Sequence, residues 1–158
     1  MQLANCQACP LFKNNPGYCT PIPGYGYGNI VITLKPDFNS ILGGIPSSLE
    51  YDFLKKIFTK LNKSFYYTHA VKCLGVVTTD IVTTCTKTWL VNELKHSIIF
   101  TLGETSKLFT KEKINKIVGQ QLKYGEHTVV HLYSTYYVLQ RGKKECIAFE
   151  NIIEKYAL

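Results

Sequence analysis

The sequence lacks a long apolar run and any segment typical of secretion. Its longest apolar run, SIIFTL, is strand-sized, whereas a membrane-spanning helix needs about 20 such residues. The N-terminal stretch MQLANCQACP has no charged flank followed by an apolar segment, which a signal peptide requires. We therefore expect a chain that stays in the cytoplasm and contacts no membrane; for a viral protein this would be the host cytoplasm.

Acidic residues are also scarce. The chain has 11 Asp and Glu residues against 18 Lys and Arg residues, which gives a formal charge of +7. A positive surplus favours a polyanionic partner, such as nucleic acid. The hydrophobic fraction of 46% is that of a folded protein, and 158 residues suffice for one hydrophobic core. We predict a single domain spanning residues 1–158.

Hydrophobic periodicity predicts strands that alternate with helices. The predicted strands span residues 29–34, 64–71, 97–102 and 127–134. Helices are predicted from Ser47 or Ser48, from Cys85 to about Lys95, from Glu104, and near the C-terminus, where the apolar stripe is Phe149, Ile152, Ile153 and Tyr156. This order predicts an α/β domain, a three-layer sandwich with a central, mainly parallel four-stranded sheet. Residues 1–28, with several Pro and Gly residues, are expected to form an irregular N-terminal arm.

The chain contains six cysteines. Because a reducing cytoplasm disfavours disulfides, we interpret them as metal ligands or buried thiols. Cys6 and Cys9 form a CxxC pair, and Cys73 and Cys85 lie near the end of the second predicted strand. Three interpretations compete: buried thiols, a dithiol redox pair at Cys6 and Cys9, and one four-cysteine metal centre. We favour the metal centre, which would fasten the arm to the α/β body, and assign buried-thiol roles to the other two cysteines. Spacing alone does not separate zinc from a [4Fe-4S] cluster.

The cysteines lie within a distinctive order of motifs. CxxCxLF is followed by a Gly-rich loop, a strand, YTHAVKC, and a cysteine that leads into TWLVNELKHSIIFTLGETSKLF. This order resembles the iron–sulfur uracil-DNA glycosylases of the family 4 type over nearly the whole chain. The resemblance implies a uracil-DNA glycosylase-like fold, with a [4Fe-4S] cluster held by Cys6, Cys9, Cys73 and Cys85. The loop between the last two cysteines is shorter than in that family.

The residues that the resemblance assigns to water activation and base stacking are replaced here. The family motif GEAPG carries a carboxylate that orients water, and Leu34 stands in its place, with Asp37 three residues further on. Leucine has no atom that accepts a proton. The family's stacking phenylalanine is replaced by Ser47, which removes about 1–3 kcal/mol of base stacking unless Phe38 supplies the ring instead.

The two remaining family motifs are altered as well. The asparagine of TNxVKC, which reads the uracil edge, is replaced by His69, and a histidine lacks the paired donor and acceptor of an amide. The histidine of HPSxxLR, which stabilises the departing uracil anion, is replaced by Ser134, and its arginine by Gln140. His131 lies three positions before Ser134, on the opposite face of a strand.

These four departures favour a retained fold without the reaction. The leading hypothesis is a non-catalytic iron–sulfur protein that binds DNA, or a protein partner in a replication or transcription assembly. The candidate nucleic-acid-binding residues are Lys35, Ser134, Tyr136, Tyr137, Gln140 and Arg141. One alternative is an active uracil-DNA glycosylase with a rebuilt pocket that uses Asp37, His69 or His131. The other is a zinc-stapled interaction module without a nucleic-acid role.

Overall fold

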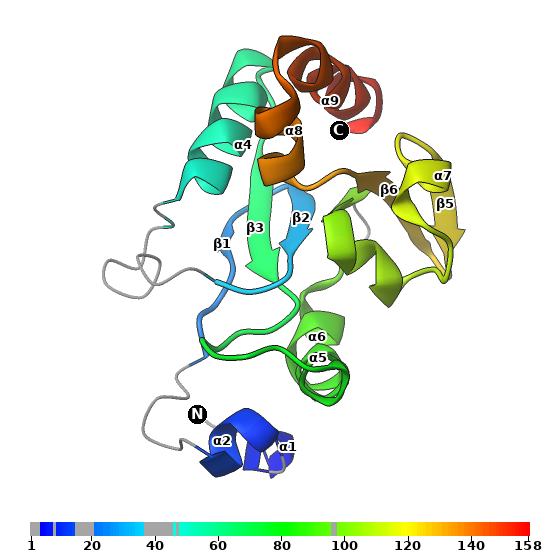
Figure 1. Ribbon diagram of the computed structural model, residues 1–158. Helices are drawn as coiled ribbons and strands as arrows, with labels where there is room; N and C mark the ends of the chain where they lie inside the picture. Colours follow the sequence, from blue (N-terminus) through cyan, green and yellow to red (C-terminus); the bar gives the residue numbers. More distant parts are fainter. Residues whose placement is uncertain (1–3, 8, 15–20, 37–45, 47, 96–97) are drawn as a thin grey trace.

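A six-stranded mixed sheet forms the centre of the protein (Figure 1). The computed structural model describes residues 4–7, 9–14, 21–36, 46, 48–95 and 98–158. The strands lie in the order β1-β3-β2-β4-β6-β5. The inner four run parallel to one another, and each edge strand is antiparallel to its neighbour. Their bounds are Tyr25–Gly26 (β1), Asn29–Thr33 (β2), Phe65–His69 (β3), Ile98–Leu102 (β4), Gln121–Tyr124 (β5) and His127–Leu132 (β6).

The prediction of an α/β domain is confirmed, but the predicted number of four strands is wrong. The four expected strands form the parallel centre of the sheet, and β1 and β5 add an edge on each side. Both edge strands lack an apolar run. β1 is two exposed residues within the stretch GYGYG, and β5 reads QLKY with three exposed positions. Tertiary pairing, rather than hydrophobic patterning, makes these segments extended.

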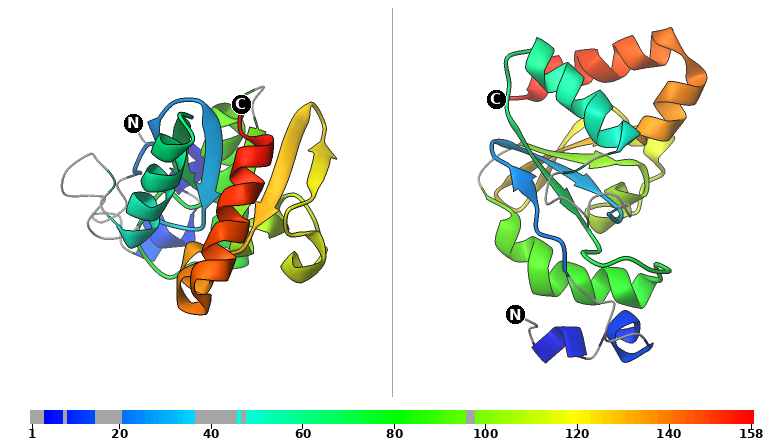
Figure 2. Two further views of the ribbon diagram at one scale, coloured as in Figure 1. Left: turned by 90° about the horizontal axis from the view of Figure 1, so that it is seen from above. Right: turned by 90° about the vertical axis from the view of Figure 1, so that its left-hand side faces the viewer.

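Helices cover both faces of the sheet, which gives three layers (Figure 2). Alternate strand residues point to opposite faces, so Val31 packs in one core and Ile30 and Ile32 pack in the other. The first face is covered by α4 (Leu49–Lys60), α8 (Thr135–Arg141) and α9 (Lys143–Tyr156). The second is covered by the continuous helical run α5 (Thr79–Cys85), η2 (Thr86–Leu90) and α6 (Val91–Glu93).

The helical run on the second face begins earlier than predicted. Thr78 caps α5, and its hydroxyl accepts a hydrogen bond from the Ile81 amide. Cys85 therefore lies at the end of α5 and not at the start of a helix. The threonine-rich sequence before Cys85 has low helix propensity, which is why pattern reading placed a loop there.

Two short helices lie within the arm that was predicted to be irregular. α1 (Ala4–Gln7) and α2 (Pro10–Asn14) contact α5, and Figure 2 shows them beneath it. Downstream of them, the Ile22 amide donates to the carbonyl of Lys72 at 2.9 Å. The remaining short elements, η3 (Gly103–Leu108) and α7 (Ile114–Ile117), lie between β4 and β5. No helix in the described part of the chain has the length and apolar character to cross a membrane.

Candidate functional site

The four cysteines predicted as metal ligands line one cavity. Cys6 and Cys9 come from the N-terminal arm, Cys73 from the segment after β3, and Cys85 from the end of α5. The cavity encloses about 420 Å³ of empty space, including its open mouth. These cysteines are thiols rather than disulfides. The fold therefore brings together three segments that are up to 79 residues apart in the sequence (from Cys6 to Cys85, 85 − 6 = 79).

The lining of this cavity suits sulfur ligands of a metal cluster. Apart from the cysteines it is mainly apolar, with Leu11, Phe12, Val71, Ile81 and Trp89 among the lining residues. The Trp89 indole Nε1 donates to Cys6 Sγ at 3.3 Å, and the Lys72 amide donates to Cys85 Sγ at 3.2 Å. Hydrogen bonds to ligand sulfurs orient them and tune a bound metal centre.

The thiols surround the cavity instead of meeting at one point. Within the described ranges, no three Cys, His, Asp or Glu side chains are grouped so that they hold a single metal ion. Burial raises the pKa of the Cys85 thiol, the neighbouring Lys72 lowers it, and negative charge at Cys6 and Cys9 raises it again. Negative charges on these cysteines thus repel one another, and a bound cation would reduce the repulsion between their thiolates.

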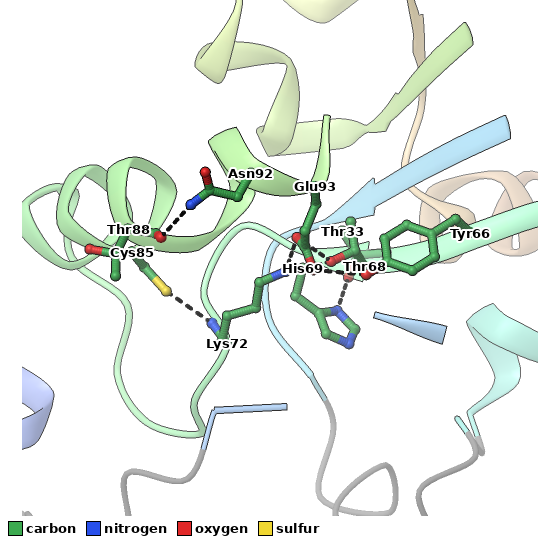
Figure 3. A network of polar contacts seen from close by, with 9 residues as sticks. All are labelled: Thr33, Tyr66, Thr68, His69, Lys72, Cys85, Thr88, Asn92 and Glu93. Carbon is green, nitrogen blue, oxygen red and sulfur yellow. Dashed lines mark hydrogen bonds and ion pairs between the residues drawn. The ribbon is translucent and has the colours of Figure 1, made fainter. Parts of the chain in front are cut away.

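A buried ion pair links the segment after β3, which carries Cys73, to α6, which continues the helical run from Cys85 (Figure 3). Lys72, only 1% exposed, directs its Nζ to Glu93 Oε2 of α6 at 2.5 Å and also to the Thr68 hydroxyl. Glu93 accepts two further hydrogen bonds, from the Tyr66 hydroxyl at 2.9 Å and the Thr68 hydroxyl at 3.0 Å. Burial lowers the pKa of Lys72, and the charge of Glu93 offsets part of that shift. The pair fixes the segment that carries Cys73 against the helical run that carries Cys85.

Of the two cysteines predicted to be buried thiols, the one that the structure describes lies away from the cavity. Cys146 is half-buried in α9, and its thiol donates to the Val138 carbonyl at 3.8 Å. Its position on the opposite side of the sheet from α5 separates it from the cavity. Cys19 lies outside the described residues.

A cleft opens at the carboxyl ends of the parallel strands, where α/β proteins usually bind ligands. It holds about 830 Å³ of empty space, and its lining includes Thr33, the last residue of β2, and Leu34, which follows it. Three of the candidate nucleic-acid-binding residues line this cleft, namely Lys35, Ser134 and Tyr136. Lys35 is exposed and donates to the Gly75 carbonyl at 3.4 Å, and Tyr136 is 57% exposed.

The cleft also contains a carboxylate that the sequence analysis missed. Glu50, in the first turn of α4, accepts hydrogen bonds from the Tyr67 hydroxyl at 2.8 Å and from the Thr135 hydroxyl at 2.7 Å. Burial, together with the charge of Glu50, raises the pKa of Tyr67 well above its usual range, so this phenol stays protonated. An acidic residue in a first helical turn is typical of helix capping, and nothing in the local sequence indicates that it lines a cleft.

The candidate catalytic residues do not gather in the cleft. His69 is 2% exposed, and its Nδ1 is hydrogen-bonded to the Thr33 hydroxyl at 2.7 Å. His131 is fully buried, with Nδ1 bonded to the Thr101 hydroxyl at 2.5 Å. Neither histidine lines the cleft. Asp37, Phe38 and Ser47 lie outside the described residues.

The remaining candidate nucleic-acid-binding residues follow Ser134 along α8. Ser134 caps this helix, and its hydroxyl accepts from the Tyr137 amide at 3.2 Å. Tyr137 is half-buried: its ring centroid lies 4.5 Å from that of Tyr133, and the Arg141 guanidinium lies 4.8 Å from the Tyr137 ring. Gln140 and Arg141 are exposed near the end of the helix. Tyr137 therefore packs within the protein, whereas Tyr136 faces solvent at the cleft.

Comparison with known proteins adds no family assignment. No protein-family model matches the chain, and no curated protein matches it at a significant level. The function must therefore be argued from the cavity, the cleft and their chemistry.

Proposed function

We propose that this chain is an iron–sulfur protein with a uracil-DNA glycosylase-like fold that has lost the glycosylase reaction and binds DNA through its cleft. One observation carries the proposal. The four cysteines that the resemblance equates with cluster ligands line a common cavity, although they come from three segments of the chain. A chance set of idle thiols has no reason to converge in this way.

We propose a [4Fe-4S] cluster rather than zinc, because the four cysteines line one cavity but, among the described residues, are not grouped closely enough to hold a single ion. A zinc ion needs four ligands within about 2.3 Å of one point, whereas each iron of a cubane takes one thiolate, so the four sulfurs surround a larger space. Cys6, Cys9, Cys73 and Cys85 would hold the cluster. When bound, the cluster would supply a covalent cross-link between the arm, the segment after β3 and α5. Trp89 and the Lys72 amide would then donate to two of its thiolate ligands.

The cleft supports the loss of the glycosylase reaction. Leu34 lines it at the position where the resemblance places a water-orienting acid, and an alkyl side chain activates no water. The Ser134 hydroxyl is engaged as a helix cap, where the family has an anion-stabilising histidine. His69 and His131 are buried and bonded to threonines instead of facing the cleft.

The charge of the chain supports a DNA partner. The net charge is +7, and Lys35 and Tyr136 place a cation and an exposed ring at the cleft. Phosphate contacts and base stacking together are how proteins bind single-stranded nucleic acid. A protein partner in a replication or transcription assembly is the second kind of partner that this surface suits.

The proposal is tested by incubating the anaerobically purified protein with uracil-containing single-stranded and duplex DNA. We expect binding whose affinity falls steeply with salt, because phosphate contacts release counterions, and we expect no abasic sites. Failure to bind any DNA at low salt would contradict the DNA-binding function. A colourless protein with one zinc per chain would favour the zinc-stapled interaction module.

One observation favours an active glycosylase as a second candidate, namely the carboxylate of Glu50 in the cleft. A carboxylate can orient water, so Glu50 is a potential replacement for the missing acid. Abasic sites that form at enzyme-like rates, and that disappear in Glu50→Gln, would establish this function instead.

A further inference from the structure

The cleft differs in charge from the protein that contains it. Its described lining carries two carboxylates, Glu50 and Glu104, and one ammonium group, Lys35, although the whole chain has a charge of +7. Glu104 is exposed and paired with Lys107 at 2.7 Å, which leaves Glu50 as the carboxylate held against the cleft wall. A phosphate placed beside Glu50 would be repelled, so at this cleft the phosphates of a nucleic acid are left to Lys35. The interior therefore suits a part of the ligand that donates hydrogen bonds.

Glu50 is held in a fixed orientation by groups from two other elements. Each of its oxygens accepts a hydrogen bond, one from Tyr67 of β3 and one from Thr135 of α8. Both donors are buried, with Tyr67 4% exposed and Thr135 fully buried. Two hydroxyls from different elements thus fix the plane of the carboxylate. This is the geometry of a built recognition group rather than of a mobile surface acid.

A fixed carboxylate selects ligands with two adjacent N–H donors, because it accepts two parallel hydrogen bonds from them. Among the nucleobases, guanine presents such a pair on its pairing edge, the ring N1–H and the exocyclic N2–H. Uracil and thymine present one N–H between two carbonyl oxygens, which a carboxylate repels. The exposed ring of Tyr136 at the same cleft offers a stacking surface, and Lys35 can reach a phosphate.

We propose that this cleft binds a guanine base of single-stranded nucleic acid, with Glu50 accepting from the base edge and Tyr136 stacking on the base. This inference rests on the proposed nucleic-acid function and specifies its ligand. An arginine side chain of a protein partner carries the same donor pair, but the positive charge of the chain disfavours a basic peptide and favours a polyanion.

The test measures base preference by fluorescence anisotropy. The probes are labelled oligothymidylates of about 12 nucleotides, each with one central guanine, adenine, cytosine, uracil or hypoxanthine, titrated with the full-length protein at low salt. The guanine probe should bind roughly tenfold more tightly than the uracil probe, the scale of one good bidentate contact. Hypoxanthine, which lacks the exocyclic amino group, should lose most of this advantage.

Two variants of equal charge change separate recognition from general electrostatics. Glu50→Gln should reduce the guanine preference to within about twofold, because an amide offers one acceptor in place of two. Glu112→Gln, which removes an exposed carboxylate outside the described lining of the cleft, should keep the preference of the unmodified protein. Should Glu50→Gln fail to fold, the guanine and hypoxanthine probes still test the inference with the unmodified protein.

The possible failures are distinguishable. Equal affinity for all five probes, with strong salt-dependent binding, would overturn the guanine inference and leave the proposed DNA-binding function in place. No binding to any probe would overturn both. An arginine-containing peptide could bind more tightly than the guanine probe, displace that probe, and lose its affinity in Glu50→Gln. This result would identify the cleft as a protein-binding site and also overturn the inference.

Discussion

At the scale of the residue, the protein contains buried polar groups that have few hydrogen-bond partners. His131 is the clearest example. Its ring is fully buried, Nδ1 is bonded to Thr101, and Nε2 has no hydrogen-bond partner within the described residues. A buried group of this kind costs free energy if it becomes charged. It therefore couples the stability of the fold to pH.

Burial lowers the pKa of His131 from its ordinary value of 6.5. The unfolded chain then binds a proton at a higher pH than the native protein does, so the free energy of unfolding should fall as the pH drops below 6.5. The slope from this single group is at most about 1.4 kcal/mol per pH unit. Urea unfolding between pH 7 and 5 should show a weaker decline in His131→Gln. The same slope in both proteins would remove His131 as the cause.

The Lys72–Glu93 pair gives the second prediction at this scale. Because Lys72 is 1% exposed, Lys72→Met leaves Glu93 without its buried cation and should destabilise the protein by about 3 kcal/mol or more. Removing both charges together in Lys72→Met/Glu93→Leu should cost less than the sum of the single changes. Chemical denaturation of the four proteins in a double-mutant cycle measures this coupling.

A surface pair provides the control for that cycle. Lys60 and Glu150 are 2.5 Å apart, but the Lys60 side chain is 68% exposed, so Lys60→Met should have little effect. Strictly additive effects of the Lys72 and Glu93 changes would show that the two side chains do not stabilise the fold as a pair.

At the scale of the element, the parts predictable from sequence were those with a strong hydrophobic pattern. β2, β4 and β6 are buried along nearly their whole length, and α4 presents Leu54, Ile57 and Phe58 on one face. The edge strands β1 and β5 and the first turns of α5 have no such pattern. Their conformation depends on neighbours that are distant in the sequence, which no local window contains.

The candidate sites show the same difference between features that a local sequence pattern predicts and features that only the tertiary fold creates. The cysteine spacing and the order of motifs identify four candidate metal ligands from the sequence alone. In contrast, nothing in the sequence around Glu50 marks this residue as part of a cleft. Its role arises because β3 and α8 bring Tyr67 and Thr135 to it. Pairings across elements of this kind are set by the tertiary fold and escape residue-by-residue reading.

The attachment of α1 and α2 is testable at this scale. These helices have four and five residues, too short to be stable alone, and they contact α5 beside the cysteine cavity. If a metal centre fastens them, Cys73→Ala and Cys85→Ala should each speed tryptic cleavage after Lys13, as followed by mass spectrometry. Cys146→Ala, which alters a cysteine away from the cavity, should leave the rate unchanged. Equal protection in all four proteins would argue against a fastening role.

At the scale of the whole molecule, the cavity and the cleft lie near the same end of the parallel sheet. The segment after β3 leads to Cys73, while β2, β4 and the start of α8 supply the cleft. Lys35 of the cleft donates to the carbonyl of Gly75, and Gly75 lies two residues beyond Cys73. A metal centre that orders this segment would therefore also support one wall of the cleft. If the proposed cluster is bound, it would have this structural role, and the proposed binding of nucleic acid should weaken when the cluster is lost.

The most direct test of the central claim is the metal content of the anaerobically purified chain, measured together with its visible absorption spectrum. The account predicts a brown protein with about four irons and four acid-labile sulfides per chain. It also predicts that Cys85→Ser loses most of this iron and that Cys146→Ser retains it. A colourless protein containing zinc, or iron that is unaffected by Cys85→Ser, would contradict the account.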